Sequence, residues 1–189
     1  MEPDEAELLR AHGAGDEGAF ARLYDRYDRS SFLFIRRMLG AGQAQAAEDL
    51  HQETWLAVAR SASQFDARRA SFAAWLYTIA RRKVLDHLRR RKVVLLGLDE
   101  DNGAMSVRDP GPTPAQQLES RQLVERLVAA VEALPEEQRD VFVLFADAGL
   151  SLEEIAEVTG VVQETAKSRL RYARARLRQA LADEWGAHV

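Results

Sequence analysis

The stretch SLEEIAEVTGVVQETAKSRLRYARARLRQAL, residues 151–181, contains two helical patterns separated by a short turn. Ser151 followed three residues later by Glu154 is the capping-box arrangement that begins a helix. A turn that contains Gly160 follows, and a second, basic segment then keeps apolar residues at helical spacing. A short capped helix, a glycine turn and a longer basic helix predict a helix-turn-helix unit.

The basic helix separates into faces when its residues are placed at about 100° per position. The stripe expected to be buried is Ala166, Leu170, Ala173, Leu177 and Leu181. Its basic flanks are Lys167, Arg171, Arg174 and Arg178 on one side and Arg169 and Arg176 on the other, with Ser168, Tyr172 and Ala175 pointing outward between them. This distribution suits a groove with phosphate walls. The alternative is a solvated helix whose arginine stems cover its apolar stripe, although Glu164 is the one acidic partner between 164 and 181.

The composition of the whole chain narrows the class of protein. The 189 residues carry a formal net charge of −4, and no apolar run approaches the roughly 20 residues that span a bilayer. The acidic N-terminus lacks a signal-peptide pattern, so we expect a soluble, cytoplasmic protein. The absence of cysteine excludes disulfides, a thiol nucleophile and thiolate zinc ligands.

A second basic segment lies far from the first, although the rest of the chain is acidic. Between residues 68 and 92, one acidic residue, Asp86, accompanies nine basic ones: Arg68, Arg69, Arg81, Arg82, Lys83, Arg89, Arg90, Arg91 and Lys92. Two basic patches on an acidic body indicate two contacts with a polyanion.

Helical periodicity extends over nearly the whole chain, and we predict an all-α protein. Helices are expected over 20–39, over 44–60 and from Ser71 onward, then over 118–134 and 136–149. The segment 93–117 is rich in glycine, proline and acidic residues and predicts a flexible linker. We therefore expect two small helical domains, 1–92 and 118–189, joined by 93–117; a long internal loop of one domain is the alternative.

The expected helix 44–60 carries two different faces. Ala47, Leu50, Thr54 and Val58 suit the core, whereas the second stripe consists of Asp49, Gln52, Glu53, Leu56 and Arg60. The second stripe could be an ordinary polar face or a binding surface. Asp49, His51 and Glu53 are residue types that bind metals. A helix directs residues at this spacing to different sides, which argues against metal catalysis.

Five segments in this order resemble the extracytoplasmic-function (ECF) sigma factors, the compact two-domain branch of the sigma-70 family. They are AFARLYDRY, AEDLHQETWLAV, FAAWLYTIARRKVLDHLRR, LPEEQRDVFVLFADAGLSLEEIAEVTG and TAKSRLRYARARLRQAL. The resemblance covers most of the chain, and it implies a subunit of bacterial RNA polymerase that recognises promoters and helps to open DNA.

The resemblance also implies roles for individual residues. The family's DxxQE docking motif, which binds the polymerase clamp helices, corresponds to Asp49, Gln52 and Glu53. A base-capturing loop corresponds to 65–71, and the basic helix after it would follow the minus-ten strand; the implied DNA contacts of this domain are Phe65, Arg68, Arg69, Arg81, Arg82 and Arg89. The recognition helix for the minus-thirty-five element would bind the major groove through Thr165, Lys167, Ser168, Arg171, Tyr172 and Arg174.

Two positions depart from the family pattern. Arg82 stands where asparagine is common in the family, and Tyr172 stands where an arginine often contacts DNA. The promoter sequence typical of the family therefore cannot be assigned to this chain. The resemblance implies core RNA polymerase, promoter DNA and an anti-sigma factor as partners, with no cofactor, no small-molecule substrate and no catalytic residue. The other hypotheses are a stand-alone helix-turn-helix regulator, which leaves the acidic helix idle, and a nuclease, for which the sequence offers no convincing constellation.

Overall fold

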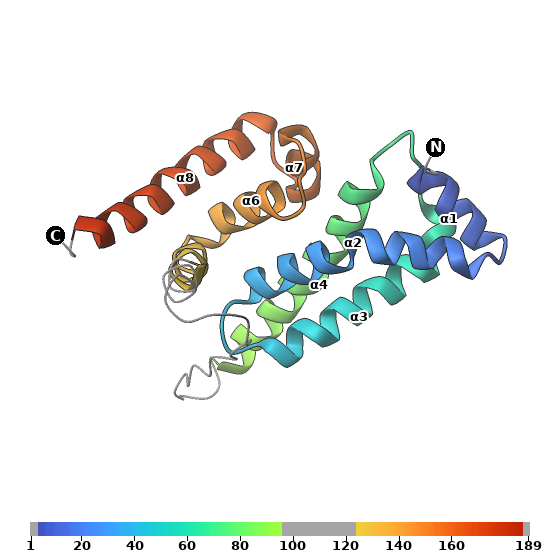
Figure 1. The fold of residues 1–189 in the computed structure, drawn as a ribbon, viewed down its shortest axis with the longest axis horizontal. Coiled ribbons are helices and arrows are strands. Elements are labelled where there is room, and N and C mark those ends of the chain that lie inside the picture. Colours follow the sequence, from blue (N-terminus) through green and yellow to red (C-terminus); the bar gives the residue numbers. More distant parts are fainter. Residues whose placement is uncertain (1–3, 96–123, 187–189) are drawn as a thin grey trace, which may run out of the picture.

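The computed structural model describes residues 4–95 and 124–186, and within these ranges the chain is helical without strands, which confirms the all-α prediction (Figure 1). The helices before the gap are α1 (Glu5–Gly13), α2 (Glu17–Leu39), α3 (Ala44–Ser61) and α4 (Phe72–Leu95), with a short 3-10 turn at Ala62–Gln64. After the gap follow a helical segment at 124–132, then α6 (Glu136–Ala146), α7 (Leu152–Thr159) and α8 (Gln163–Gly186).

The first domain consists of α1 to α4. Helices α2, α3 and α4 pack on one another, and α1 lies against α2. Helix α1 is not among the predicted helices, because its segment is mainly acidic. A local feature and a tertiary contact stabilise this helix. Its N-terminus is held by a capping box between Asp4 and Glu7, and Leu8 and Leu9 are buried in a cluster with Leu23.

Side-chain caps begin two helices of the first domain, α2 and α4. Asp16 accepts a hydrogen bond from the backbone N–H of Ala19 at the start of α2. At α4, Ser71 Oγ accepts from the N–H of Ala74 at 3.1 Å, as the sequence predicted. Helix α6 ends at Ala146, earlier than the predicted end at Gly149.

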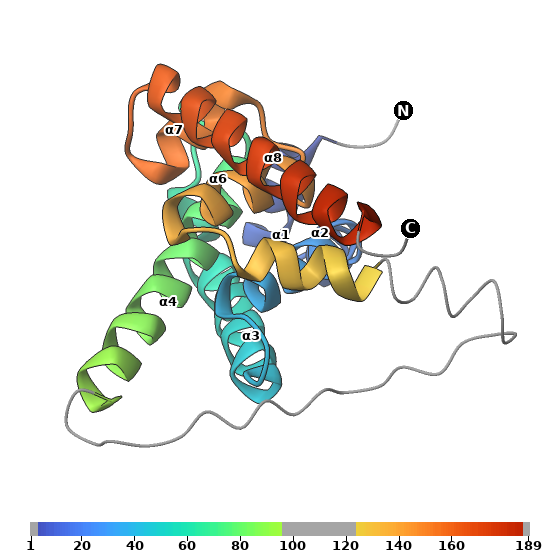
Figure 2. The ribbon, with the colours of Figure 1, turned by 90° about the vertical axis from the view of Figure 1, so that its left-hand side faces the viewer.

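The helix-turn-helix unit is α7 and α8. Ser151 and Glu154 form the predicted capping box, and Gly160 ends α7 in the left-handed conformation at φ 72°. Four of the five residues predicted for the inner stripe of α8 are buried, and the fifth, Leu181, is half-buried. The buried stripe packs on α6 and α7 (Figure 2), while Lys167, Arg171 and Arg174 remain exposed on another face of α8.

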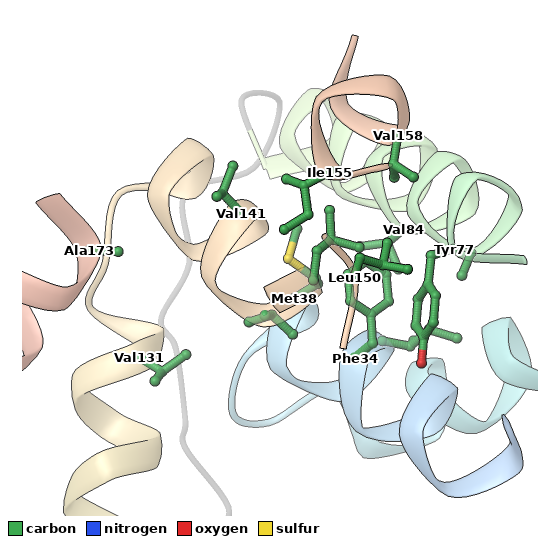
Figure 3. Packing of buried hydrophobic residues seen from close by; sticks show 14 of the residues in the cluster. Phe34, Met38, Tyr77, Val84, Val131, Val141, Leu150, Ile155, Val158 and Ala173 are labelled. Atoms are coloured by element: carbon green, nitrogen blue, oxygen red, sulfur yellow. The ribbon is translucent and has the colours of Figure 1, made fainter. Parts of the chain in front are cut away.

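The two domains touch each other, which the expectation of a flexible tether did not foresee. Helix α2 contacts α6, and α4 contacts α7. Figure 3 shows Phe34, Met38 and Tyr77 close to Leu150 and Ile155, so one apolar cluster continues from the first domain into the second. Most of the predicted linker, residues 96–117, lies outside the described residues, and the domain boundaries stay a prediction. No described helix is long and apolar enough to cross a membrane.

Candidate functional site

The second stripe of α3 is fully presented to solvent. Its five side chains, Asp49, Gln52, Glu53, Leu56 and Arg60, are all exposed, and Leu56 retains 53% of its accessible surface. The opposite face, with Ala47, Leu50, Thr54 and Val58, is buried as predicted. Within residues 4–95 and 124–186 the stripe is no part of the packed core, which leaves its side chains available to a partner.

Two weak contacts hold the carboxylates of this stripe. Gln45 Nε2 donates to Asp49 Oδ1 at 3.2 Å, and Lys83 Nζ of α4 donates to Glu53 Oε2 at 3.0 Å. The Glu53 side chain is 57% exposed, and such ion pairs stabilise a fold by at most about 1 kcal/mol. Both carboxylates are thus oriented but accessible.

A buried polar network supports the inner face of α3. Trp55 Nε1 donates to His51 Nε2 at 3.1 Å, and Ser31 Oγ lies 3.0 Å from the same nitrogen. Because Trp55 can only donate, His51 Nε2 must accept, and the imidazole is neutral. Burial lowers the pKa of His51, although Asp28, whose Oδ1 is 3.5 Å away, acts in the opposite direction. His51 therefore has a structural role, because it joins α3 to Ser31 of α2 inside the first domain.

This network predicts that the protein loses stability in mild acid. The folded chain holds the pKa of His51 below the ordinary value of 6.5, so the unfolded chain binds the proton more readily. Stability should fall as the pH drops below 6.5, and His51→Gln should reduce that dependence. Urea unfolding at pH 7.5 and 5.5 checks this, with His87→Gln as the control. An equal loss in the unaltered chain and in His51→Gln would contradict the assignment.

The loop before α4 borders a cavity of about 350 Å³. Phe65, Arg69 and Trp75 line it from the first domain, and the Phe65 and Trp75 ring centroids are 5.2 Å apart. Glu157 and Val158 of α7 line it from the second domain. Aromatic faces beside a guanidinium suit a planar, unstacked base, but in this structure α7 forms part of the wall.

Arg68 and Asp66 in the same loop form a bidentate pair. Arg68 Nε and Nη2 donate to the two Asp66 carboxylate oxygens at 3.0 and 2.8 Å, and the Arg68 N–H also donates to Oδ1. Hydrogen bonds from Arg68 lower the pKa of Asp66 to about 2. The Arg68 side chain is nevertheless 90% exposed, so the pair shapes the loop without hiding the cation.

Arg81 differs from the other predicted DNA contacts, because the second domain covers it. Its Nε donates to Asp140 Oδ2 of α6 at 2.6 Å, and its Nη1 approaches the carbonyl oxygen of Val158 at 3.5 Å. Arg82 and Arg89 are exposed, with Arg89 donating to Asp86 at 3.0 Å. Of the three arginines of α4 predicted to contact DNA, the structure thus leaves Arg82 and Arg89 exposed and covers Arg81.

The six predicted residues of α8 lie together on the outer side of the second domain. Lys167, Arg171, Tyr172 and Arg174 are exposed, whereas Thr165 and Ser168 are half-buried. Ser168 Oγ donates to the carbonyl oxygen of Thr165 at 3.0 Å. The opposite flank is less open, because Arg169 donates to Glu137 at 2.6 Å.

Aromatic rings position two of these arginines. The Arg171 guanidinium carbon lies 5.0 Å from the centroid of the Tyr172 ring, and that of Arg174 lies 4.5 Å from the centroid of Phe145. Such contacts orient a guanidinium, and Arg171 Nη2 also donates to the Tyr172 hydroxyl at 3.3 Å. The roles assigned to these residues stay predictions.

The residues that join the domains cannot be found from helical periodicity. They are Arg37, Asp140, Asp147 and Glu154: Arg37 donates to Asp147, Ser71 donates to Glu154, and Asp140 binds Arg81. No periodicity or motif couples residues about sixty to one hundred and ten positions apart, so the sequence carried no signal for them. Among the described residues, no group of His, Cys, Asp and Glu could hold a metal ion.

Two family models and two solved structures match this chain. Residues 23–93 match the family described as Sigma-70 region 2, and residues 124–177 match Sigma-70, region 4. The fold resembles the solved structures of CnrH in complex with the cytosolic domain of CnrY (TM-score 0.68, 23% identity, 95% of this chain and 97% of that chain) and of RpoE with the anti-sigma factor NepR from Bartonella quintana (TM-score 0.68, 24% identity, 86% and 96%).

Curated relatives give the family. The ECF RNA polymerase sigma factor RpoE of Cereibacter sphaeroides is 34% identical over 167 residues, which are 88% of this chain and 88% of the relative. The ECF RNA polymerase sigma factor SigM of Mycobacterium tuberculosis is 35% identical over 180 residues, which are 95% of this chain and 86% of the relative. With both sigma regions in order and similarity over almost its whole length, the chain belongs to the ECF RNA polymerase sigma factors.

Proposed function

We propose that this sigma factor binds core RNA polymerase through α3 and promoter DNA through the loop 65–71, α4 and α8. One observation carries the proposal: the chain presents two exposed surfaces of different chemistry on separate helices. One combines carboxylates, an amide and Leu56 on α3, and the other is the basic outer face of α8. A stand-alone helix-turn-helix regulator has no use for the first surface and is not favoured.

The α3 surface is suited to a protein partner. Asp49, Gln52 and Glu53 offer hydrogen-bond acceptors and donors around Leu56, an apolar group that costs free energy while it faces water. An apolar centre with a polar surround is the usual anatomy of a protein interface. We assign this surface to the clamp of core RNA polymerase.

The first domain supplies what a separated DNA strand needs. Phe65 and Trp75 offer ring faces for an extruded base, and Arg69 stands at the same cavity. Arg68, Arg82 and Arg89 are exposed cations along the path from this loop down α4. We assign this face to the minus-ten strand.

The α8 surface is suited to a duplex. Its cations flank an outward strip with Ser168 and Tyr172, so the flanks can bind phosphates while the strip reaches base edges. Tyr172 is 53% exposed and presents both a ring and a hydroxyl. We assign this strip to the minus-thirty-five element and Tyr172 to its sequence preference.

We propose three further properties. The chain has no catalytic chemistry of its own, and it works in the cytoplasm, where RNA polymerase is found. It is also controlled by an anti-sigma factor. Support for the last comes from the RpoE structure of similar fold, which was solved with the anti-sigma factor NepR.

Reconstituted transcription tests the proposal. Purified chain is added to core RNA polymerase and a library of random promoter fragments, with any anti-sigma factor absent. We expect core binding and initiation from a distinct subset of fragments. If neither appears, the sigma assignment of these surfaces fails. Sequence-specific binding of duplex DNA without core binding would support the stand-alone regulator instead.

A further inference from the structure

The ring of Phe145 lies at the surface of α6, outside the core of the second domain. It retains 38% of its accessible surface, although its neighbours Val143 and Leu144 are completely buried. Phe142, three residues earlier, packs against the apolar cluster formed by the described residues, to which Phe145 does not belong. A large apolar side chain that faces water costs free energy. Packing within the core therefore does not explain this ring.

The side chain of Arg174 lies over this ring. The guanidinium carbon of Arg174 is 4.5 Å from the centroid of Phe145, within the roughly 6 Å over which an aromatic face attracts a cation. The two side chains come from different helices, α6 and α8, which pack on each other. The packing of the domain thus sets where the ring holds the arginine.

The ring holds Arg174 without neutralising its charge. Within residues 4–95 and 124–186, the guanidinium of Arg174 has no carboxylate partner and donates no hydrogen bond. Arg169, on the other flank of α8, instead donates to Glu137 at 2.6 Å. A carboxylate occupies the N–H groups of an arginine, whereas a ring contacts the face of the guanidinium and leaves its edge for an anion.

We propose that Phe145 is a positioning residue for promoter binding and acts through Arg174. Ordering a long side chain when a complex forms reduces affinity, and the ring orders Arg174 before DNA binds. The N–H edge of the guanidinium is then held ready for a phosphate on the flank that also carries Lys167 and Arg171. This inference rests on the proposed role of α8 and adds α6 to the elements that determine how the duplex is bound.

Duplex binding by the full chain tests this role. Phe145→Leu keeps an apolar side chain and removes the aromatic face. Fluorescence anisotropy with a duplex selected from the random promoter fragments should show an affinity about two- to fivefold lower, the range of an exposed cation–π contact. The salt slope should stay unchanged, because Arg174 keeps its charge and its phosphate. Phe145→Tyr, which preserves the ring, should bind like the unaltered chain.

A double-mutant cycle separates positioning from a general effect on the fold. In an Arg174→Ala background the ring has no cation to hold, so Phe145→Leu should lower the affinity no further. An equal loss with and without Arg174 would overturn the inference, because the ring would then act on the fold or on DNA directly. Leu127→Ala is the matched control, since Leu127 is 39% exposed on the helical segment at 124–132, and it should bind normally.

The inference and the proposed function fail in different ways. If Arg174→Ala weakens duplex binding and Phe145→Leu does not, the inference alone is wrong. If the unaltered chain binds no duplex from the library, the proposed role of α8 is wrong, and the inference fails with it.

A second measurement needs no DNA. The ring current of Phe145 should shift the Nε–H proton of Arg174 upfield in a proton–nitrogen NMR spectrum of the full chain, and Arg174→Ala identifies that signal by its loss. In Phe145→Leu we expect the signal to move toward the position of a solvated arginine. Arg176, which is exposed and contacts no ring in the part of the chain that the structure describes, should not move. An unchanged Arg174 signal would show that Phe145 does not hold the guanidinium and would overturn the inference.

Discussion

Replacing Asp49 and Glu53 together by alanine is expected to abolish binding of core RNA polymerase while leaving the fold intact. Both side chains are exposed on α3, and their only described contacts are with Gln45 and Lys83. An interface residue at a binding hot spot costs about 2 kcal/mol or more when truncated, so losing two should reduce affinity by several hundredfold or about a thousandfold. Native gels with core polymerase measure the affinity, and thermal unfolding measures the fold.

Glu48→Ala is the matched control for this double variant. Glu48 is an exposed carboxylate on the same helix, directly before Asp49, but outside the proposed docking stripe. It should bind core polymerase normally. If the Asp49 and Glu53 variant unfolds as much as it loses binding, those residues are structural and the docking assignment is wrong.

Replacing Arg171 and Arg174 by alanine is expected to remove binding to duplex promoter DNA. Both cations lie exposed on one flank of α8, each held over an aromatic ring. If each binds one phosphate, the slope of log affinity against log salt should become shallower by about 2. Fluorescence anisotropy with a library-selected duplex, over a series of salt concentrations, measures both quantities.

Arg29→Ala, at an exposed position of α2, controls for the loss of a positive charge outside the recognition helix. It should leave the salt slope unaltered. A double variant of Arg171 and Arg174 with weaker binding but an unchanged slope would show that these arginines contact something other than phosphate. Unchanged binding would place the recognition face elsewhere on the domain.

Most helices of the fold could be predicted from local features of the sequence. The stripe of α8, the capping box at Ser151 and the exposed face of α3 all follow from helical spacing over a few residues, and the structure has them as predicted. Helix α1 was missed because its acidic composition concealed two leucines, Leu8 and Leu9, that find their partners only in the folded domain.

The interface between the domains could not have been predicted in the same way. Arg37 and Asp147 are separated by 110 positions, and Arg81 and Asp140 by 59. Taken singly, each reads as an ordinary charge on a helix surface, and Arg81 reads as one more cation in a basic run. Their pairing depends on how two domains face each other, which periodicity within one helix does not determine.

The carboxylate of Glu154 stabilises two features of the structure, whereas that of Asp140 takes part, among the described residues, only in the contact with Arg81. The Glu154 carboxylate closes the capping box of α7 and also accepts the hydroxyl of Ser71 from the other domain. Substitutions at Asp140 or Asp147 should therefore affect mainly the contact between the domains, whereas a change at Glu154 also weakens the start of the helix-turn-helix unit. The contact between the domains and the start of the helix-turn-helix unit thus share one side chain, so a change at Glu154 alters both at once.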